Sequence, residues 1–364
     1  MAKMRVIVVG GFLGAGKTTL LAQAAKHFVG QGKRVGIVTN DQAAHLVDTL
    51  LLKALNVEIE EVSGGCFCCR FEDLERAANR LFKDIHPDVL LTEPVGSCTD
   101  ISATVLQPMK QQWGEWVEIS QFSVLADPRR LRRTLDADPT FPESVRYIIK
   151  KQFEEADCIV INKTDLLSRN ELAQLREKIA STWHGTKILE ISALKNRGVS
   201  EWLDAISGGQ RGGNKILDVD YDTYALGEAQ LGWLNTSLSL TPQGETDWNA
   251  FALKVLCRIQ NELADRSAEI GHLKVLLTNS TSQIVANVTS IREKPSIYGN
   301  MGINTETVTL ILNARALVEP DQLKSIVESS ISDAAADTVE VSRLSMDSFS
   351  PAYPQPTHRI TRVV

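Results

Sequence analysis

The sequence has no long hydrophobic run and no excess of positive charge. Nowhere in its 364 residues does an apolar stretch approach the roughly 20 residues that span a bilayer. The N-terminus enters a strand-like segment without a signal-like hydrophobic region, so we expect a cytoplasmic protein with no membrane partner. With 39 basic and 45 acidic residues the formal net charge is −6, which argues against a broad nucleic-acid-binding surface.

Cysteine is also scarce, at six residues, and three of the six lie within four positions. Such clustering favours metal or redox chemistry in a reducing compartment over a disulfide scaffold. The length is sufficient for two domains. Basic residues are dense only in one short run, which we interpret as a solvated helix face: Arg129, Arg130, Arg132 and Arg133.

The apolar run that begins at Val6 stops at a glycine-rich turn. The spacing Gly11-x-x-x-x-Gly16-Lys17-Thr18 predicts a phosphate-binding loop, because its backbone N–H groups can point at a polyphosphate. We expect Lys17 to reach the terminal phosphates and the Thr18 hydroxyl to bind Mg²⁺, at the positive end of the following helix dipole. The residues expected at the phosphates are Gly11, Gly14, Ala15, Gly16, Lys17, Thr18 and Thr19.

A second polar motif, Asn162-Lys163-Thr164-Asp165, follows the apolar run CIVI and predicts a guanine site. An aspartate carboxylate accepts hydrogen bonds from N1–H and the 2-amino group of guanine, which adenine does not offer. Asp165 would make these bonds, with Asn162 and Lys163 bracing the pocket. We expect a backbone N–H of Ser192-Ala193-Leu194 to meet the guanine oxygen.

Two carboxylates directly follow predicted strands. Glu93 comes after DVLLT and Asp41 after VGIVT, so both are expected beside the phosphate loop, where Mg²⁺ and the attacking water are held. Asp41 as the cap of the next helix is the alternative. The predicted catalytic residues are Lys17, Asp41 and Glu93, and the predicted Mg²⁺ ligands are Thr18, Asp41 and Glu93.

The stretch SGGCFCC at residues 63–69 carries three thiols, those of Cys66, Cys68 and Cys69. They could converge on one soft metal ion, because thiolates favour ions such as Zn²⁺. Three protein ligands leave one position open, which fits an ion that is passed on or sensed, and His45 is the candidate fourth ligand. Buried small side chains or redox-active thiols are the alternative. The other cysteines are interpreted as core residues: Cys98, Cys158 and Cys257.

Strand-like and helix-like segments alternate through residues 1–207. This alternation predicts an α/β domain of the P-loop NTPase type, with a mostly parallel sheet whose carboxyl edge collects the ligands. Beyond the first strand, the expected strands are 34–39, 57–62, 88–92, 119–125, 158–162 and 187–191. The expected helices include 20–30, 72–82 and 170–182.

Glycine-rich residues 208–216 predict a linker, and residues 217–349 a smaller α+β domain. One helix should bury Phe251, Val255, Ile259 and Leu263, and Pro320 should open a second helix. The expected strands lie at 221–240, 272–278, 283–289, 307–317 and 338–344. Residues 350–364 contain several prolines and predict an extended tail laid over another surface.

In their order, GGFLGAGKTTL, GGCFCC, EPVG and NKTD resemble the CobW family of metal-associated GTPases, relatives of the UreG and HypB nickel-insertion GTPases. The match covers about residues 1–207; the segment TNDQ after the second strand is closer to UreG. The resemblance implies Mg²⁺-dependent GTP hydrolysis coupled to binding of Zn²⁺ or Co²⁺. It assigns these residues to phosphate, Mg²⁺, base and cargo metal: Lys17, Thr18, Glu93, Asn162, Asp165, Cys66, Cys68 and Cys69.

The leading hypothesis is a GTPase metallochaperone that delivers a metal or metal cofactor to a metalloprotein or corrinoid-enzyme client. Hydrolysis is expected to be slow without the client or a GTP-dependent homodimer. A non-metal GTP switch that protects or reloads a cofactor-dependent enzyme, with structural cysteines, is the alternative. A P-loop kinase acting on a small molecule is a third reading, against which NKTD argues.

Overall fold

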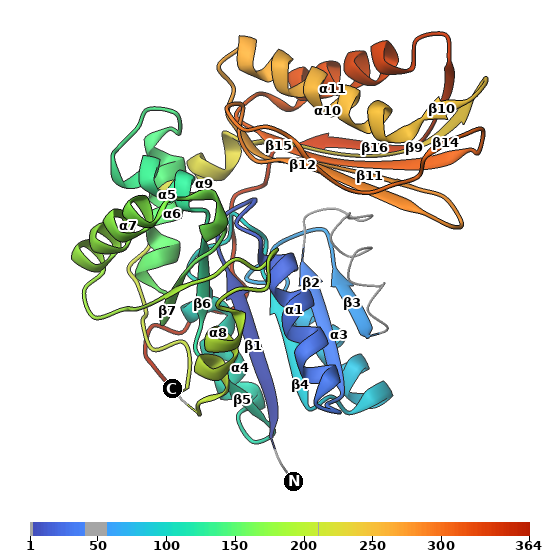
Figure 1. Ribbon diagram of the computed structural model, residues 1–364. Coiled ribbons are helices and arrows are strands. Elements are labelled where there is room, and N and C mark those ends of the chain that lie inside the picture. Colours follow the sequence, from blue (N-terminus) through green and yellow to red (C-terminus); the bar gives the residue numbers. More distant parts are fainter. Residues whose placement is uncertain (1–2, 41–56, 210) are drawn as a thin grey trace. The chain divides into compact units, whose positions relative to one another are not determined.

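The computed structural model describes residues 3–40, 57–209 and 211–364 (Figure 1). Within these residues the chain divides into two compact units. The first contains the described residues up to Gly227 together with Tyr353–Val364, and the second contains residues 228–352. No helix in the described ranges is both long and apolar enough to cross a membrane.

The first unit is built on a parallel sheet, as predicted. Its described strands lie in the order β3-β2-β4-β1-β6-β7-β8, with β5 paired to β1. Strands β4 and β6 are buried along their whole length, which is typical of parallel sheets covered on both faces. The strands are β1 (Met4–Gly10), β2 (Val35–Asn40), β3 (Glu58–Val62), β4 (Val89–Glu93), β5 (Val117–Ile119), β6 (Ser123–Ala126), β7 (Cys158–Ile161) and β8 (Lys187–Glu190).

Two helices of this unit, α5 and α7, begin at side-chain caps. The Ser168 hydroxyl and Glu171 form a capping box at the start of α7, and Asp127 caps α5 by accepting from the N–H groups of Arg129 and Arg130. The described helical segments are α1 (Lys17–Gly30), α3 (Phe71–Ile85), the π-helical η1 (Ser102–Leu106), α4 (Gln107–Trp113), α5 (Pro128–Leu135), α6 (Glu143–Glu154), the 3₁₀ turn η2 (Thr164–Leu166), α7 (Arg169–Thr182), α8 (Val199–Ser207) and α9 (Tyr221–Ala229).

Two strand predictions are wrong in part. Residues 221–240 form helix α9 and only then strand β9, because the Asp220 carboxylate accepts hydrogen bonds from the N–H groups of Asp222 (3.0 Å) and Thr223 (3.2 Å) and starts a helix. Residues 119–125 are divided between β5 and β6. Between them the Phe122 N–H donates to a side chain, the Asp157 carboxylate (2.8 Å), instead of continuing the ladder.

The stretch expected to be a flexible linker is packed onto the first unit. The Gly212 N–H donates to the Ile119 carbonyl (3.0 Å), and those of Gly213 and Asn214 donate to Asp157 (2.6 and 3.2 Å). The boundary between the units accordingly follows Gly227, not residue 207. The tail from residue 353 onward has no helix or strand and belongs to the first unit.

The second unit is α+β, as predicted. Its six-stranded antiparallel sheet has the order β13-β12-β11-β15-β9-β16, and β10 and β14 form a separate pair within the described residues. The last strand is longer than expected and reaches Phe349. The elements are β9 (Gly232–Pro242), β10 (Thr246–Asp247), α10 (Trp248–Asp265), β11 (Ile270–Thr278), β12 (Gln283–Val288), β13 (Ser296–Gly299), β14 (Ile303–Asn304), β15 (Val308–Ala316), α11 (Pro320–Ala335) and β16 (Val339–Phe349).

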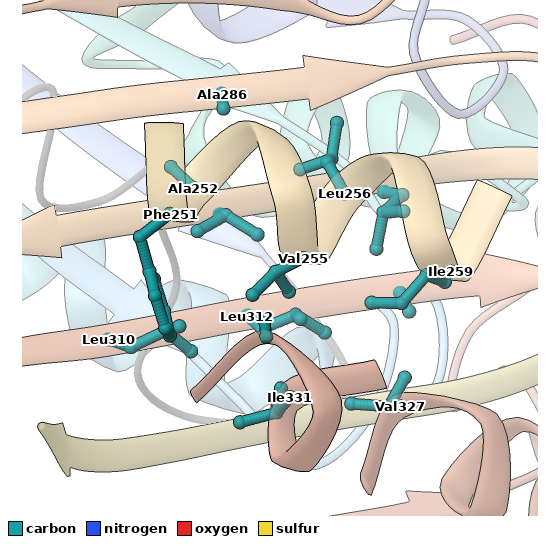
Figure 2. Close-up of a cluster of buried hydrophobic side chains, with 14 of the residues drawn as sticks. Phe251, Ala252, Val255, Leu256, Ile259, Ala286, Leu310, Leu312, Val327 and Ile331 are labelled. Carbon is teal, nitrogen blue, oxygen red and sulfur yellow. The ribbon is translucent and has the colours of Figure 1, made fainter. Parts of the chain in front are cut away.

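The core of the second unit lies between its helices and its sheet. Phe251, Val255 and Ile259 recur at helical spacing on α10, so one face of the helix is apolar. Figure 2 shows this face beside Leu312 of β15 and Val327 of α11, and all five side chains are buried. Packing of this kind stabilises the unit by removing apolar surface from water.

Candidate functional site

The phosphate loop joins β1 to α1 at the carboxyl edge of the parallel sheet. Gly11 and Gly16 have φ values of 127° and 94°, in the left-handed region. A Cβ on either residue would lie 2.4 Å from another atom, the Leu125 carbonyl oxygen or the Asn162 amide nitrogen respectively. Only glycine fits these positions. The Lys17 ammonium donates to the Gly11 carbonyl at 2.9 Å, so it already lies over the loop that would surround the phosphates.

Thr18 and Glu93 meet because β1 and β4 are neighbouring parallel strands. The Thr18 hydroxyl lies 3.0 and 3.2 Å from the two carboxylate oxygens of Glu93, whose side chain is buried. Hydroxyl and carboxylate oxygens are the ligands that Mg²⁺ prefers, so this pair fits the ion expected beside the phosphates. The predicted residues Asp41 and His45 lie outside the described part of the chain.

The predicted base-binding residues gather at the ends of β7 and β8. The Asn162 amide donates to the Ala15 carbonyl (2.8 Å), and its oxygen accepts from the Ala193 N–H (3.0 Å). Asn162 therefore ties the phosphate loop to the segment after β8. The Ser192 hydroxyl donates to the Asp165 carboxylate (2.6 Å), which keeps that carboxylate at the same edge. The Leu194 side chain is exposed, so only its main chain is suited to the expected role.

Sequence reasoning missed a partly buried ion pair beside this motif. The Lys163 ammonium lies 2.7 Å from the carboxylate of Asp127, which is 6% exposed. Burial alone would raise the pKa of Asp127, but the positive charges of Lys163 and Arg130 and the capping hydrogen bonds lower it to about 2. The dipeptide Asp127-Pro128 after a predicted strand is a helix N-cap signature. The sequence could therefore have predicted the cap, but not the ion pair.

Arg130 corrects the interpretation of the basic run as a solvated face. Its side chain is buried, with the guanidinium 5.3 Å from the ring centre of Phe12 and 5.4 Å from that of Phe141. It also donates to the Leu13 carbonyl of the phosphate loop. A cation close to two aromatic rings is attracted to them and helps to hold the loop in place. Arg129, by contrast, is exposed as expected.

The three clustered thiols do converge. The sulfur atoms of Cys66, Cys68 and Cys69 lie 2.7, 3.4 and 3.7 Å apart, and the first two residues are buried. Hydrogen bonds with Cys68 and Cys69 lower the pKa of Cys66, whereas the bond between Cys66 and Cys68 raises the pKa of Cys68. Zinc with bonds of about 2.3 Å to sulfur needs sulfurs roughly 3.8 Å apart. The donor set therefore fits a soft metal after small adjustments.

Asn40, the last residue of β2, connects this cysteine turn to the loop after Glu93. Its amide nitrogen donates to the carbonyls of Val62 (3.0 Å) and Gly65 (2.8 Å). Its oxygen accepts from the N–H groups of Phe67 (2.8 Å) and Val95 (3.4 Å). One buried side chain thus satisfies four main-chain groups from the turn and the loop, and a shift of either segment must disturb the other.

The C-terminal tail covers the cysteine turn. The Thr357 N–H donates to the Cys68 carbonyl (2.9 Å), and the Gln355 N–H donates to the Cys69 sulfur (3.2 Å). The tail is fastened by Arg359, whose guanidinium donates to the buried Asp100 carboxylate at 2.7 Å. Burial raises the pKa of Asp100, although its hydrogen bonds from Arg359 and a tyrosine hydroxyl act in the opposite direction.

Comparison with known proteins gives a family match within the first unit. The CobW/HypB/UreG nucleotide-binding domain matches residues 5–190. The zinc chaperone CobW of Sinorhizobium sp is 28% identical over 200 residues, covering 49% of this chain and 56% of that protein. The zinc-regulated GTPase metalloprotein activator 1 of Schizosaccharomyces pombe is 26% identical over 207 residues, covering 55% of this chain and 48% of that protein.

Among solved structures, HypB from Helicobacter pylori in complex with nickel has 18% identity and a TM-score of 0.43, covering 57% of this chain and 90% of that chain. The chain spans about half the length of the curated relatives it matches. The family match includes the phosphate loop, the cysteine turn and the NKTD motif. The chain belongs to the CobW/HypB/UreG family of nucleotide-binding proteins.

Proposed function

We propose that this chain is a GTP-hydrolysing metallochaperone. It binds Mg²⁺-GTP at the phosphate loop, holds Zn²⁺ or Co²⁺ at the cysteine turn, and couples hydrolysis to delivery of the metal to a client metalloprotein. Its curated relatives carry the names zinc chaperone and zinc-regulated GTPase metalloprotein activator. The observation that carries the proposal is the Asn40 side chain, which joins the cysteine turn to the loop after Glu93.

At the nucleotide, each residue has a role that its position supports. Lys17 and the loop N–H groups bind the terminal phosphates, and Thr18 with Glu93 holds Mg²⁺, which neutralises the charge that develops during phosphoryl transfer. Asp165 selects guanine over adenine through two charge-assisted hydrogen bonds. Since catalysis of this kind depends on placement and charge, the rigid contacts of the loop with Asn162 and Arg130 keep its N–H groups in place.

At the cysteine turn the metal is cargo. Thiolates of Cys66, Cys68 and Cys69 bind it, and each must lose its proton to do so, which makes the affinity fall as the pH falls. If GTP favours the arrangement in which the thiols converge, then the metal binds more tightly to the GTP form. By linkage GTP then binds more tightly to the metal form, by the same factor.

The test measures this linkage in the full chain. Zinc and cobalt affinities, determined with a competing chelator in the nucleotide-free, GDP and GTP-analogue forms, should differ by roughly 5- to 150-fold for a coupling of about 1–3 kcal/mol. Joint replacement of Cys66, Cys68 and Cys69 by Ser should remove metal binding and leave the metal-free GTP affinity nearly unchanged. Cys257→Ser, on α10 of the second unit, is the matched control. Identical metal affinities in all three forms would refute the coupling.

Finer aspects of the proposal concern rate and partners. We expect slow hydrolysis by the chain alone, and acceleration by the client or by a GTP-dependent homodimer. The client is a metalloprotein, with corrinoid enzymes as one class, and the setting is the cytoplasm. Turnover measured across protein concentrations separates the two sources of acceleration, since only a homodimer makes the rate per chain depend on concentration.

A further inference from the structure

A fourth cysteine lies beside the three clustered thiols. Cys98 is 3% exposed, and its thiol is hydrogen-bonded to the thiols of both Cys66 and Cys68. It comes from a different part of the chain, the loop after β4 that begins with Glu93. It does not belong to the tight group of three sulfurs within 4.8 Å of one another.

The main chain around Cys98 is firmly placed. Its N–H donates to the Val95 carbonyl (2.9 Å), closing a turn, and its carbonyl accepts from the Gln152 amide (2.7 Å). The same Gln152 amide also bonds the Gly96 carbonyl (3.0 Å). On the other side Asn40 holds the Val95 N–H together with the cysteine turn. The loop after β4 and the cysteine turn are therefore connected by hydrogen bonds that do not involve sulfur.

We propose that Cys98 is the fourth protein ligand of the metal held by Cys66, Cys68 and Cys69, which makes a four-thiolate site. This inference rests on the proposed function, because it assumes that the clustered thiols bind the metal. Four sulfur ligands complete the tetrahedral set that Zn²⁺ takes in closed sites. Cys98 must move closer to the other three for this, since it lies outside the group whose sulfurs are within 4.8 Å of one another.

A metal bound in this way joins the cysteine turn directly to the nucleotide site. Cys98 lies five positions after Glu93, which accepts from the Thr18 hydroxyl. Between them, Gly96 packs against the phosphate loop so closely that a Cβ there would lie 2.9 Å from the Leu13 main-chain nitrogen. If GTP hydrolysis displaces this loop, the Cys98 sulfur moves away from the metal. The metal then has an open coordination position from which it can be transferred to the client. Cys98 would thus act as the exchangeable ligand.

The test counts sulfur atoms around the metal. The full reduced chain is loaded with Zn²⁺ or Co²⁺ and studied by X-ray absorption, with Co²⁺ charge-transfer absorption as a second readout. We expect four sulfur ligands at about 2.3 Å in the wild type. Cys98→Ser should give three sulfurs and one lighter ligand, and charge-transfer intensity near three quarters of wild type. Metal affinity should fall by at least the roughly 10- to 100-fold that loss of a supporting partner costs.

Cys257→Ser is the control and should leave sulfur count, absorption and affinity unchanged. If Cys98→Ser folds poorly, Cys98→Ala and the sulfur count of the wild type still decide the question. Three sulfurs in the wild type, with unchanged affinity in both Cys98 variants, would overturn the proposal while leaving the metallochaperone function intact. A wild-type chain that binds neither metal would overturn both.

Discussion

Replacement of Lys163 by Met tests the partly buried ion pair that supports the guanine motif. Methionine keeps the unbranched apolar part of the side chain, but Asp127 loses the ammonium 2.7 Å from its carboxylate. Lowering of the Asp127 pKa from 3.8 to about 2 corresponds to roughly 2.4 kcal/mol, at about 1.36 kcal/mol per tenfold change in proton affinity. Breaking a fully buried pair costs about 3–5 kcal/mol, and the cost here is smaller because the Lys163 side chain is 23% exposed. Because two N–H groups and Arg130 still stabilise the carboxylate, we expect a loss of about 2–4 kcal/mol at pH 7.

The pH dependence has a definite sign. A carboxyl group whose pKa is lower in the folded state stabilises the fold above its unfolded pKa and loses this contribution as the pH falls through the folded value. The wild-type contribution of Asp127 should therefore be complete near pH 7, fall to about half at pH 3, and vanish below pH 2. The stability difference between wild type and Lys163→Met should narrow over the same range.

Urea unfolding of the full chain measures the effect, using the transition that GDP shifts to higher urea as the one belonging to the first unit. Lys150→Met, at an exposed lysine on α6, is the matched control and should change stability by less than about 0.5 kcal/mol. A double-mutant cycle with Asp127→Asn isolates the pair. A coupling energy near zero, or a stability loss independent of pH, would refute the reasoning.

Three further predictions concern the nucleotide and the tail. Asp165→Asn should weaken GTP binding by roughly two to four orders of magnitude, if each lost hydrogen bond is worth about 1.5–3 kcal/mol; calorimetry with GTP and ATP checks this, and equal wild-type affinities would contradict a guanine site. Lys17→Ala and Thr18→Ala should each abolish phosphate release and leave unfolding of the second unit unchanged. Arg359→Ala should cost about 1.5–3 kcal/mol, since a buried carboxylate loses a charged donor, and should speed alkylation of Cys69; an unchanged alkylation rate would show that the tail does not shield that thiol.

Several features of this protein were determined by local sequence. Glycine at positions 11 and 16 is required by left-handed backbone that no other residue adopts without strain. The spacing of these glycines is therefore enough to predict the phosphate loop. The convergence of Cys66, Cys68 and Cys69 likewise follows from a single turn, closed by the Cys69 N–H on the Cys66 carbonyl at 3.0 Å. Strand and helix alternation then predicted the parallel sheet, because each segment carries its own hydrophobic period.

Predictions from local sequence patterns were wrong where a hydrogen bond to an aspartate changed the conformation of the segment. The Asp220 carboxylate starts a helix at Tyr221, although the residues that follow read as a strand. The glycines near residue 213 suggested a free linker, but the Asp157 carboxylate accepts hydrogen bonds from the N–H groups of Gly213 and Asn214. In both cases hydrogen bonds made by one aspartate outweighed the weak preference of the segment.

Only the tertiary structure decided which distant residues meet at the site. Arg359 and Asp100 are separated by 259 positions, and nothing in either neighbourhood indicates the other. Asn40, at the end of a buried strand, satisfies main-chain groups 22 to 55 positions away. Such contacts depend on strand order and on the cost of leaving buried polar groups unpaired, and these are properties of the whole fold. The sequence thus determined the chemical groups of the nucleotide and metal sites, whereas the fold determined the side chains that connect them.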